Sequence, residues 1–301
     1  LFESNSSTPL WVKSYSARAE SIAVSDNGSF VAVGSWSTSN SLLIITKSGE
    51  VSSFNLAAHV KDVAISSNGH NIVVGTQETS DGDEIYYFSK SGSSFVESWS
   101  KDLGAQVLSV AISGDGETVV AGTESINKIF FFGKSSNETL SSYPTYIGGI
   151  SEVDISRDGK HTVAGSYSDS FFYFPQNYII SDFVYKVAGN NGVTYDVSIS
   201  ANGKYTVAVG KVGVVGYISV IDTLLSKELW YWQDSQLYCY VKSVSISSDG
   251  SVFAIGDSCG MVKLYYTINA TIIWSYDTGS SADNVALSAD GQYLAVGNTG
   301  N

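Results

Sequence analysis

The chain has 301 residues, of which only 15% are charged, and its formal net charge is −13. Its 16 Lys and Arg residues form no basic stripe of the kind that binding to nucleic acid or to anionic lipid requires, which argues against both partners. No apolar run approaches the roughly 18 residues of a membrane-spanning helix.

The chain starts at Leu1 without a Met or a basic and apolar leader. We therefore interpret Leu1 as a mature N-terminus from which a secretion signal was removed. With so few charges, the surface is expected to be solvated by Ser, Thr, Asn and Tyr side chains. Such surfaces are common outside the cell, so the composition favours an extracellular or cell-surface location.

A short segment recurs seven times and ends each time in Asp-Gly or Asn-Gly. The copies are residues 21–28, 62–69, 109–116, 152–159, 196–203, 243–250 and 284–291, and their final glycines are 41 to 47 residues apart. In each copy a large residue alternates with a small one, as in Val63-Ala64-Ile65-Ser66, which predicts a strand with one large and one small face. The Asx-Gly pair is expected to supply the positive-φ positions of a tight hairpin turn.

Three more strands are predicted after the first strand of each repeat. The second is short and ends in Gly, as at residues 31–34 and 294–297, and its small residues would let neighbouring sheets approach closely. The third is aromatic in residues 85–88, 128–132, 171–174 and 264–266, and the fourth often carries Trp, as at Trp11, Trp99 and Trp274. Four strands per repeat without a helical period predict an all-β fold, a seven-bladed β-propeller of four-stranded antiparallel blades.

The last repeat lacks its outer strands, because only four residues follow Gly297. Residues 1–15 resemble the missing strands: Leu10-Trp11 aligns with Ile273-Trp274, and Leu1-Phe2 aligns with Leu264-Tyr265. We therefore expect residues 1–15 to complete the last blade, so that residues 1–301 form a single ring-shaped domain. The closing strand could come from the same chain or from a neighbouring copy, and the sequence leaves both open.

The repeated pattern Ser-Val-Ala-Ile-Ser-x-Asp-Gly, Ala-Val-Gly, aromatic strand and Leu-Trp resembles the Trp-Asp-like and pyrroloquinoline-quinone-like propeller repeats, especially those of cell-surface proteins. The resemblance covers essentially the whole chain. It implies the fold rather than a function, since propellers serve as enzymes, scaffolds and adhesins alike. The Gly-His and Trp-Asp dipeptides of eukaryotic Trp-Asp repeats are absent, and no residue set matches a quinone site, so no cofactor is expected.

The two cysteines are the strongest local signal. Cys239 precedes the first strand of the sixth repeat, Cys259 follows its second strand, and each lies ten residues from Asp249 in the intervening turn. An antiparallel pair places such positions opposite one another, at the separation that a disulfide needs. We predict a Cys239–Cys259 bridge and an oxidising compartment; two unrelated buried thiols are the alternative.

Four glycosylation sequons occur, at Asn5, Asn27, Asn137 and Asn269. A chain this rich in Asn, Ser and Thr would contain several by chance. If the protein is secreted, Asn137 and Asn269 are the better acceptors, because they fall in predicted hairpin loops whereas Asn27 occupies a tight turn.

The sequence contains no recognisable catalytic or metal-binding constellation. The three histidines, His59, His70 and His161, are spread over different repeats and are interpreted as solvated loop residues. The acidic stretch 81–84 lacks the spacing of a calcium loop and is interpreted as a solvated turn. No Ser-His-Asp set, phosphate-binding glycine loop or zinc pattern stands out, so we expect neither catalytic residues nor a metal site.

Two sets of residues are candidates for binding. A small polar or acidic residue precedes the first-strand Val or Ile of each repeat, and in a propeller these would surround one mouth of the channel: Ser21, Asp62, Ser109, Glu152, Asp196, Ser243 and Asn284. They could hold a cation or polar ligand, or simply cap strand ends. Loops on the same face carry aromatic residues that could bind glycan or protein, or pack over the blade ends: Trp36, Tyr146, Tyr167, Trp232, Tyr238 and Tyr240.

The sequence therefore favours a non-enzymatic extracellular structural or interaction protein, such as a surface-layer, adhesin or filament subunit, which associates with itself or with another surface protein or glycan. The alternative is a quinoprotein-like enzyme or ligand-binding propeller with a site at one channel mouth. An intracellular scaffold of the Trp-Asp type would need free thiols.

Overall fold

Every regular element in the residues that the structure describes is a β-strand. The computed structural model describes residues 9–80, 82–145, 148–168, 170–175, 183–186, 192–233 and 238–299. The chain divides into two units, Leu1–Pro144 and Thr145–Asn301. The strands form antiparallel sheets in chain order, six with four strands and one with two among the described residues.

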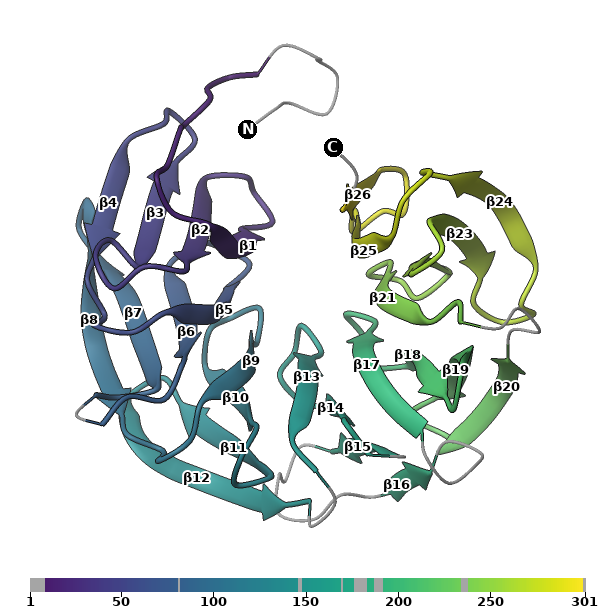
Figure 1. Ribbon diagram of the computed structural model, residues 1–301. Helices are drawn as coiled ribbons and strands as arrows, with labels where there is room; N and C mark the ends of the chain where they lie inside the picture. Colours follow the sequence, from purple (N-terminus) through teal and green to yellow (C-terminus); the bar gives the residue numbers. More distant parts are fainter. Residues whose placement is uncertain are drawn as a thin grey trace. The chain divides into compact units, whose positions relative to one another are not determined.

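The first unit contains three four-stranded sheets, coloured purple to teal in Figure 1. Their strands are β1 (Ala19–Val24), β2 (Phe30–Ser35), β3 (Leu42–Thr46) and β4 (Val51–Phe54); β5 (Val60–Ile65), β6 (Asn71–Thr76), β7 (Ile85–Ser91) and β8 (Ser94–Lys101); and β9 (Val107–Ile112), β10 (Thr118–Thr123), β11 (Lys128–Gly133) and β12 (Ser136–Pro144). Successive sheets meet through their first strands, since β1 contacts β5 and β5 contacts β9.

The second unit contains three four-stranded sheets and a two-stranded one (Figure 1). Their strands are β13 (Ile150–Ile155), β14 (Thr162–Ser166), β15 (Ser170–Phe174) and β16 (Phe183–Lys186); β17 (Gly192–Ile199), β18 (Tyr205–Val212), β19 (Val215–Asp222) and β20 (Lys227–Gln233); β21 (Val241–Ile246), β22 (Val252–Asp257), β23 (Met261–Tyr266) and β24 (Ile272–Asp277); and β25 (Ala282–Leu287) and β26 (Leu294–Asn298). Here too each first strand contacts the next one, from β13 through β17 and β21 to β25.

The predicted all-β fold of antiparallel four-stranded sheets is confirmed, and the sheets have the strand order of propeller blades. The aromatic third strands lie where the sequence places them, at β7, β11, β15 and β23. The closed ring of seven blades and the single domain completed by residues 1–15 stay predictions. Residues 1–8 of that segment lie outside the described residues.

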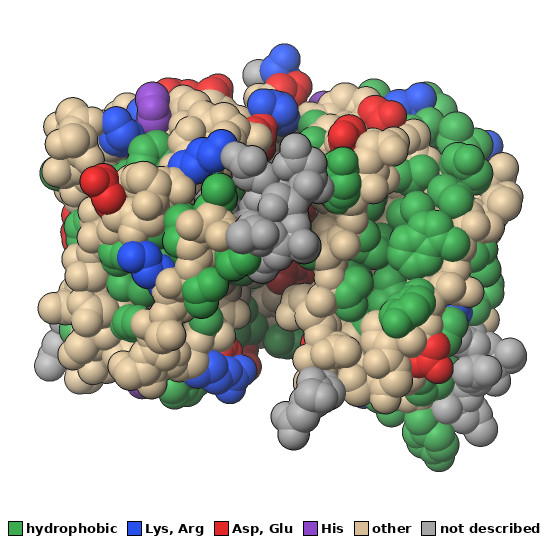
Figure 2. All heavy atoms as spheres, turned by 90° about the horizontal axis from the view of Figure 1, so that it is seen from above, with side chains coloured by type: hydrophobic (Ala, Val, Ile, Leu, Met, Phe, Trp, Pro, Cys, Tyr) green, Lys and Arg blue, Asp and Glu red, His purple; other side chains and the backbone are tan. Residues whose placement is uncertain are grey.

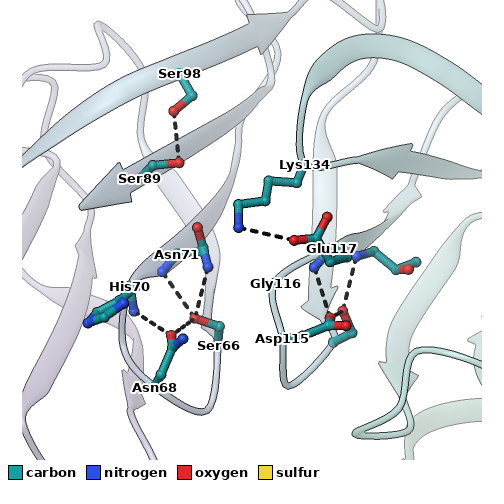
Figure 3. Close-up of polar contacts among 12 residues, drawn as sticks. Ser66, Asn68, His70, Asn71, Ser89, Ser98, Asp115, Gly116, Glu117 and Lys134 are labelled. Atoms are coloured by element: carbon teal, nitrogen blue, oxygen red, sulfur yellow. Dashed lines mark hydrogen bonds and ion pairs between the residues drawn. The ribbon is translucent and has the colours of Figure 1, made fainter. Parts of the chain in front are cut away.

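The recurring Ser-x-Asx-Gly segment closes the hairpin between the first and second strands by side-chain hydrogen bonds (Figure 3). Ser66 Oγ donates to Asn68 Oδ1 at 3.0 Å and accepts the Asn71 N–H at 3.0 Å, while Asn68 Oδ1 accepts the His70 N–H at 2.9 Å. The same Ser–Asx hydrogen bond occurs in seven hairpins: Ser25–Asn27, Ser66–Asn68, Ser113–Asp115, Ser156–Asp158, Ser200–Asn202, Ser247–Asp249 and Ser288–Asp290.

The expectation that both Asx and Gly supply positive φ is wrong, since only the Gly does. Gly69 has φ +73° whereas Asn68 is not in the left-handed region. The turn is longer than a two-residue hairpin, because residues 66–70 separate β5 from β6. The Asx residue is therefore selected for its side-chain oxygen, which accepts backbone N–H groups, rather than for its backbone conformation.

The core of each unit lies between neighbouring sheets. In the first unit Val73, Tyr87 and Trp99 of the second sheet pack against Val110 and Phe132 of the third. The second-strand glycines make this approach possible. A Cβ on Gly34 would lie 3.0 Å from Val60 Cβ in the next sheet. The equivalent distances are 3.1 Å for Gly75 and Val107, 3.3 Å for Gly165 and Thr194, and 3.1 Å for Gly256 and Ala282. The predicted role of these small residues is confirmed.

Fourth-strand tryptophans also connect neighbouring sheets. Trp99 Nε1 of β8 donates to Lys134 O, directly after the third strand of the next sheet, at 3.0 Å. Trp230 of β20 donates to Thr267 O at 2.8 Å in the same way. Trp11 donates to Lys47 O at 3.0 Å, directly after β3. Trp11 thus makes the contact of a fourth-strand Trp, although residues 10–15 form no strand.

Candidate functional site

The polar residues that precede the first-strand Val or Ile tie neighbouring sheets together. In the first unit Asp62 Oδ1 accepts hydrogen bonds from Ser21 Oγ and from the Val63 N–H, both at 2.8 Å. Asp62 Oδ2 accepts the Val110 N–H of the following sheet at 2.8 Å. One carboxylate therefore binds groups from three sheets. These contacts agree with the strand-capping interpretation of the series.

The second unit repeats this arrangement. Asp196 Oδ2 accepts the Val244 N–H at 2.8 Å, and Ser243 Oγ accepts the Val285 N–H at 3.2 Å. In the β13 sheet the bridging carboxylate belongs to Asp154, two residues beyond the predicted Glu152, and its Oδ2 accepts the Ile199 N–H at 2.9 Å. Sequence reasoning missed Asp154, although an acidic residue in place of the usual Ala or Ser at that strand position was visible.

Burial changes the titration of these carboxyl groups. It raises the pKa of Asp154 to about 6 and the pKa of Asp196 to about 7, against opposing hydrogen bonds from backbone N–H groups that lower each pKa. Burial also raises the pKa of Asp62 above its ordinary value. Raised values of this kind accompany catalytic acids as well as structural carboxyls. Here each carboxylate already accepts backbone N–H groups, so its geometry is that of a structural bridge.

The interpretation of the histidines as solvated loop residues is wrong for two of the three. His161 is half-buried, its Nδ1 lies 2.6 Å from Tyr173 Oη, and the two rings stack. Burial is the largest cause that lowers the pKa of His161, and Lys160 lowers it further while Asp158 raises it. His59 packs on Trp36 with ring centroids 4.5 Å apart. The imidazole rings of His59 and His161 therefore both pack against a neighbouring aromatic ring.

The acidic stretch 81–84 is not a simple solvated turn. Asp81 lies outside the described residues, but Glu84 is fully buried and its Oε2 accepts the Leu103 N–H at 2.7 Å. Burial raises the pKa of Glu84. An open polar pocket of about 480 Å³ lies nearby in the chain, lined in part by Glu78 and Glu124. Among the described residues no group of three His, Cys, Asp or Glu side chains is arranged to hold a metal ion.

The aromatic residues proposed as an interaction face fall in both units. In the first, Trp36 is exposed and lies under Lys61, whose Nζ is 4.5 Å from the ring centroid. Tyr146 lies outside the described residues. In the second unit Tyr167 is exposed, whereas Trp232 and Tyr240 are half-buried and lie beneath Lys263 and Lys211 respectively. Several of these rings therefore contact cations of this same chain.

Tyr238 differs from the other aromatic residues. Its side chain is 65% exposed, and its backbone adopts φ +71°, a conformation that is strained for a bulky residue. Hydrogen bonds hold that backbone in place, because Tyr238 N donates to Val214 O at 2.7 Å and Tyr238 O accepts from Ser258 Oγ at 3.2 Å. The neighbouring disulfide fixes the same segment.

The predicted disulfide is confirmed. Cys239 and Cys259 are bonded, with Cα atoms 5.3 Å apart, and the structure contains no free cysteine. The bridge links the residues before β21 to the β22–β23 turn, as the spacing around Asp249 predicts.

Three sequons fall in the described part of the chain, and Asn5 does not. Asn27, Asn137 and Asn269 are exposed. Asn27 Oδ1 is engaged in the β1–β2 turn. The predicted loop position of Asn137 is wrong, because the β11–β12 turn is only residues 134–135 and Asn137 lies in strand β12, where its Nδ2 donates to Ser100 O at 3.0 Å. Asn269 lies in the β23–β24 turn. Their glycan occupancy stays a prediction.

Comparison with known proteins adds little about function. The model of a family described as a family of unknown function (DUF5711) matches residues 3–131, less than half of the chain. No curated protein matches the chain. No helix among the described residues is long and apolar enough to cross a membrane.

Proposed function

We propose that the protein is a non-enzymatic extracellular structural or interaction protein that associates with copies of itself, as subunits of surface layers, adhesins or filaments do. The observation that carries this proposal is the incomplete sheet at the end of the second unit. Within the described ranges strand β26 pairs with β25 alone, whereas the second strand of every other described sheet has a neighbour on both sides. An unpaired edge readily accepts a strand from another chain.

Apolar side chains next to this edge support the proposal. Trp274 on β24 is 39% exposed, whereas its counterpart Trp99 on β8 is 8% exposed. Trp99 packs on the third strand of the next sheet, whereas the sheet that follows β24 has only two strands among the residues that the structure describes. Ile272 and Tyr276 on β24 are exposed too. Figure 2 shows hydrophobic side chains gathered on the side where Figure 1 places β24–β26. Such patches mark interaction sites.

Two further observations support the location and the absence of an enzymatic role. A disulfide is expected in oxidising compartments and is rare in the cytosol. Two acidic members of the series predicted as a ligand site, Asp62 and Asp196, instead accept backbone N–H groups of the neighbouring sheets, and so does Asp154.

The test combines localisation with assembly. Intact producing cells are probed with a protein-specific antibody before and after external protease, and native material is imaged by electron microscopy. We expect a protease-sensitive surface label and ordered multi-subunit assemblies. A label that appears only after lysis, or a chromophore or stoichiometric calcium in the purified protein, would contradict the proposal in favour of an intracellular scaffold or a quinoprotein-like enzyme.

A further inference from the structure

Three sequons lie in the described part of the chain, and the contacts of their side chains separate one from the other two. N-glycosylation attaches a sugar to Asn Nδ2, and the Ser or Thr two residues later is part of the motif. An acceptor therefore needs a free Nδ2 and an accessible hydroxyl at that later position, in addition to an exposed Asn. Asn27, Asn137 and Asn269 are all exposed, so exposure alone does not choose between them.

Asn137 is held by its acceptor nitrogen. Its Nδ2 donates to Ser100 O of β8, in the preceding sheet, at 3.0 Å. Thr139, the third residue of this sequon, is half-buried and pairs with Phe132 in the β11–β12 ladder. Attachment of a sugar would have to displace the first contact, and the modifying enzyme would have to reach a hydroxyl that lies within a sheet. The contacts of Asn137 therefore disfavour it as an acceptor.

Asn27 belongs to the structural turn between β1 and β2. Its Oδ1 accepts hydrogen bonds from both Ser25 Oγ and the Ser29 N–H at 2.9 Å. Ser29, whose hydroxyl completes this sequon, is half-buried. The turn is also tied to the next sheet, because Asp26 N donates to Ser67 O at 3.1 Å. The side chain of Asn27 and the backbone around it are therefore fixed on several sides, and the sequon hydroxyl is not fully open.

Asn269 meets all three requirements. Its Oδ1 accepts the Thr271 N–H at 3.1 Å, which turns the amide oxygen toward the backbone of its own turn. No described residue accepts a hydrogen bond from Asn269 Nδ2. Thr271 is exposed, and its hydroxyl forms no hydrogen bond within the described ranges. This turn therefore leaves both the acceptor nitrogen and the sequon hydroxyl open.

The β23–β24 turn is anchored where it begins and open where the acceptor lies. Thr267 N donates to Ser251 O at 3.0 Å, and Thr267 O accepts from Trp230 Nε1 at 2.8 Å. Beyond this point Ile268 is 67% exposed, and Tyr266, at the end of β23, is 50% exposed. An enzyme can therefore approach the acceptor, and a bulky glycan has room beside it.

We propose that Asn269 carries an N-linked glycan and that Asn27 and Asn137 do not. This inference rests on the proposed extracellular role, because sequons are modified in secreted proteins. The chain supplies the acceptor amide. The co-substrate is an oligosaccharide whose first sugar is bound through its C1 atom to a lipid phosphate.

The reaction exchanges one bond at the first sugar for another. Asn269 Nδ2 attacks C1 and forms the N–C1 bond, while the bond between C1 and the phosphate oxygen breaks. The lipid phosphate leaves with the electron pair of that bond, and Nδ2 gives one of its two protons to a base of the modifying enzyme. Because Oδ1 takes no part, its hydrogen bond with the Thr271 N–H is kept and the turn need not change.

Mass spectrometry of tryptic glycopeptides, on protein purified from its producing cells, tests the assignment. Residues 264–301 contain no Lys or Arg and no sequon other than that of Asn269. Trypsin therefore places this acceptor on a peptide that starts at Leu264, separate from the peptides of Asn27 and Asn137. We expect a sugar mass on Asn269 and none on the other two.

Variants expressed in the same cells verify the site. Asn269→Gln removes the acceptor, and Thr271→Ala removes the sequon hydroxyl while it keeps Asn269. Both should lose the sugar mass and migrate faster in electrophoresis. Thr271→Ser keeps a hydroxyl and should keep the modification. Asn137→Gln, at another exposed sequon, is the matched control and should migrate like the wild type.

The outcomes distinguish this proposal from the proposed function. If intact cells are labelled by the antibody but Asn269 is unmodified, the glycan assignment is wrong while the extracellular role stands. A sugar mass on Asn27 or Asn137 overturns the choice between the three sequons. Unmodified Asn269 in a protein that the antibody reaches only after lysis overturns both proposals.

Discussion

Asp62 Oδ2 accepts the backbone N–H of Val110 at 2.8 Å and so ties β5 to β9. The other oxygen of the same carboxylate accepts from Ser21 Oγ and from its own neighbour Val63. Because the side chain sits among the first strands of three sheets, it satisfies backbone groups that water would otherwise have to reach. Asp62 alone therefore links the three sheets of the first unit by hydrogen bonds.

We expect Asp62→Ala to lower the free energy of unfolding by about 1–3 kcal/mol, because it leaves the buried Val110 N–H without an acceptor. Asp62→Asn keeps one acceptor oxygen, so it should lower the free energy of unfolding by less than Asp62→Ala does. Urea denaturation followed by fluorescence measures both changes. Glu50→Ala, at an exposed position between β3 and β4, is the control and should stay within a few tenths of a kcal/mol of wild type. Equal losses for Asp62→Ala and Glu50→Ala would refute the bridging role.

Asp154 and Asp196 should make the protein more stable in mild acid than at alkaline pH. Their folded-state pKa values of about 6 and about 7 lie above the ordinary value of 3.8. Between these limits the folded state binds more protons than the unfolded state, so the free energy of unfolding falls as pH rises. The stability that the two protonated carboxyl groups contribute is fully present below pH 3.8, and it is lost as pH rises through about 6 for Asp154 and about 7 for Asp196. We expect the melting temperature to fall from pH 5 to pH 8.

The variants Asp154→Asn and Asp196→Asn assign this pH dependence, because an amide does not titrate. Each should flatten the decline in melting temperature between pH 5 and pH 8, whatever its effect on stability at a single pH. Asp26→Asn, at an exposed position, should keep the wild-type slope. The comparison stays above pH 4.5, since hydrogen bonds and Lys242 lower the pKa of Asp283 and its contribution is lost in stronger acid. An unchanged slope in both test variants would contradict the assignment.

Reduction of the Cys239–Cys259 bridge should lower the free energy of unfolding by about 3 kcal/mol, the value expected for a loop of this length. The bridge closes a separation of 20 residues around the β21–β22 hairpin. Urea titrations with and without reductant measure the difference, and mass spectrometry verifies the redox state. The double variant Cys239→Ala/Cys259→Ala should show the same loss and no response to reductant. A wild type that is equally stable in both redox states would show that the bridge adds no stability.

A pair of glycine variants separates close packing from backbone effects. Gly75→Ala places a Cβ 3.1 Å from Val107 Cβ and should destabilise the protein by about 1–3 kcal/mol. Gly297→Ala holds the same place in its own repeat but meets only Asn284 at 3.7 Å. It should leave the unfolding of the monomer nearly unchanged. Thermal unfolding of the dilute protein measures both, and a similar loss in the two variants would refute the explanation for the repeated glycine.

The repeat made the strands of this chain predictable to an unusual degree. Alternation of large and small residues located the first strands, and the glycine after each second strand reported the close approach of the next sheet. The position of Cys239 and Cys259 around Asp249 was enough for the disulfide, because register in a hairpin is set by the turn. Trp99 and Trp274 located fourth strands, whereas the fourth-strand Trp230 on β20 was not predicted.

Contacts between sheets were much harder to foresee. The Ser66 hydroxyl that closes its turn looked like an ordinary small strand residue, and Asn68 looked like a positive-φ position. The role of Asp62 as an acceptor for Val110 depends on a residue 48 positions away, which no local pattern reports. Likewise the burial of Glu84 and the pairing of His161 with Tyr173 follow from tertiary packing, so the interpretation of both as solvated was wrong.

Backbone hydrogen bonds join successive turns, from Asp26 to Ser67 and from Ser67 to Gly114. Because backbone atoms make them, they bear on whether the number of repeats can change. Within the first unit and within the second, each repeat donates from its turn to the backbone carbonyl of the next turn, whichever repeat supplies the residues. We therefore expect duplication or loss of one whole repeat within a unit to preserve these hydrogen bonds between the turns of the remaining repeats. We expect chains with this sequence pattern to differ in length by whole repeats.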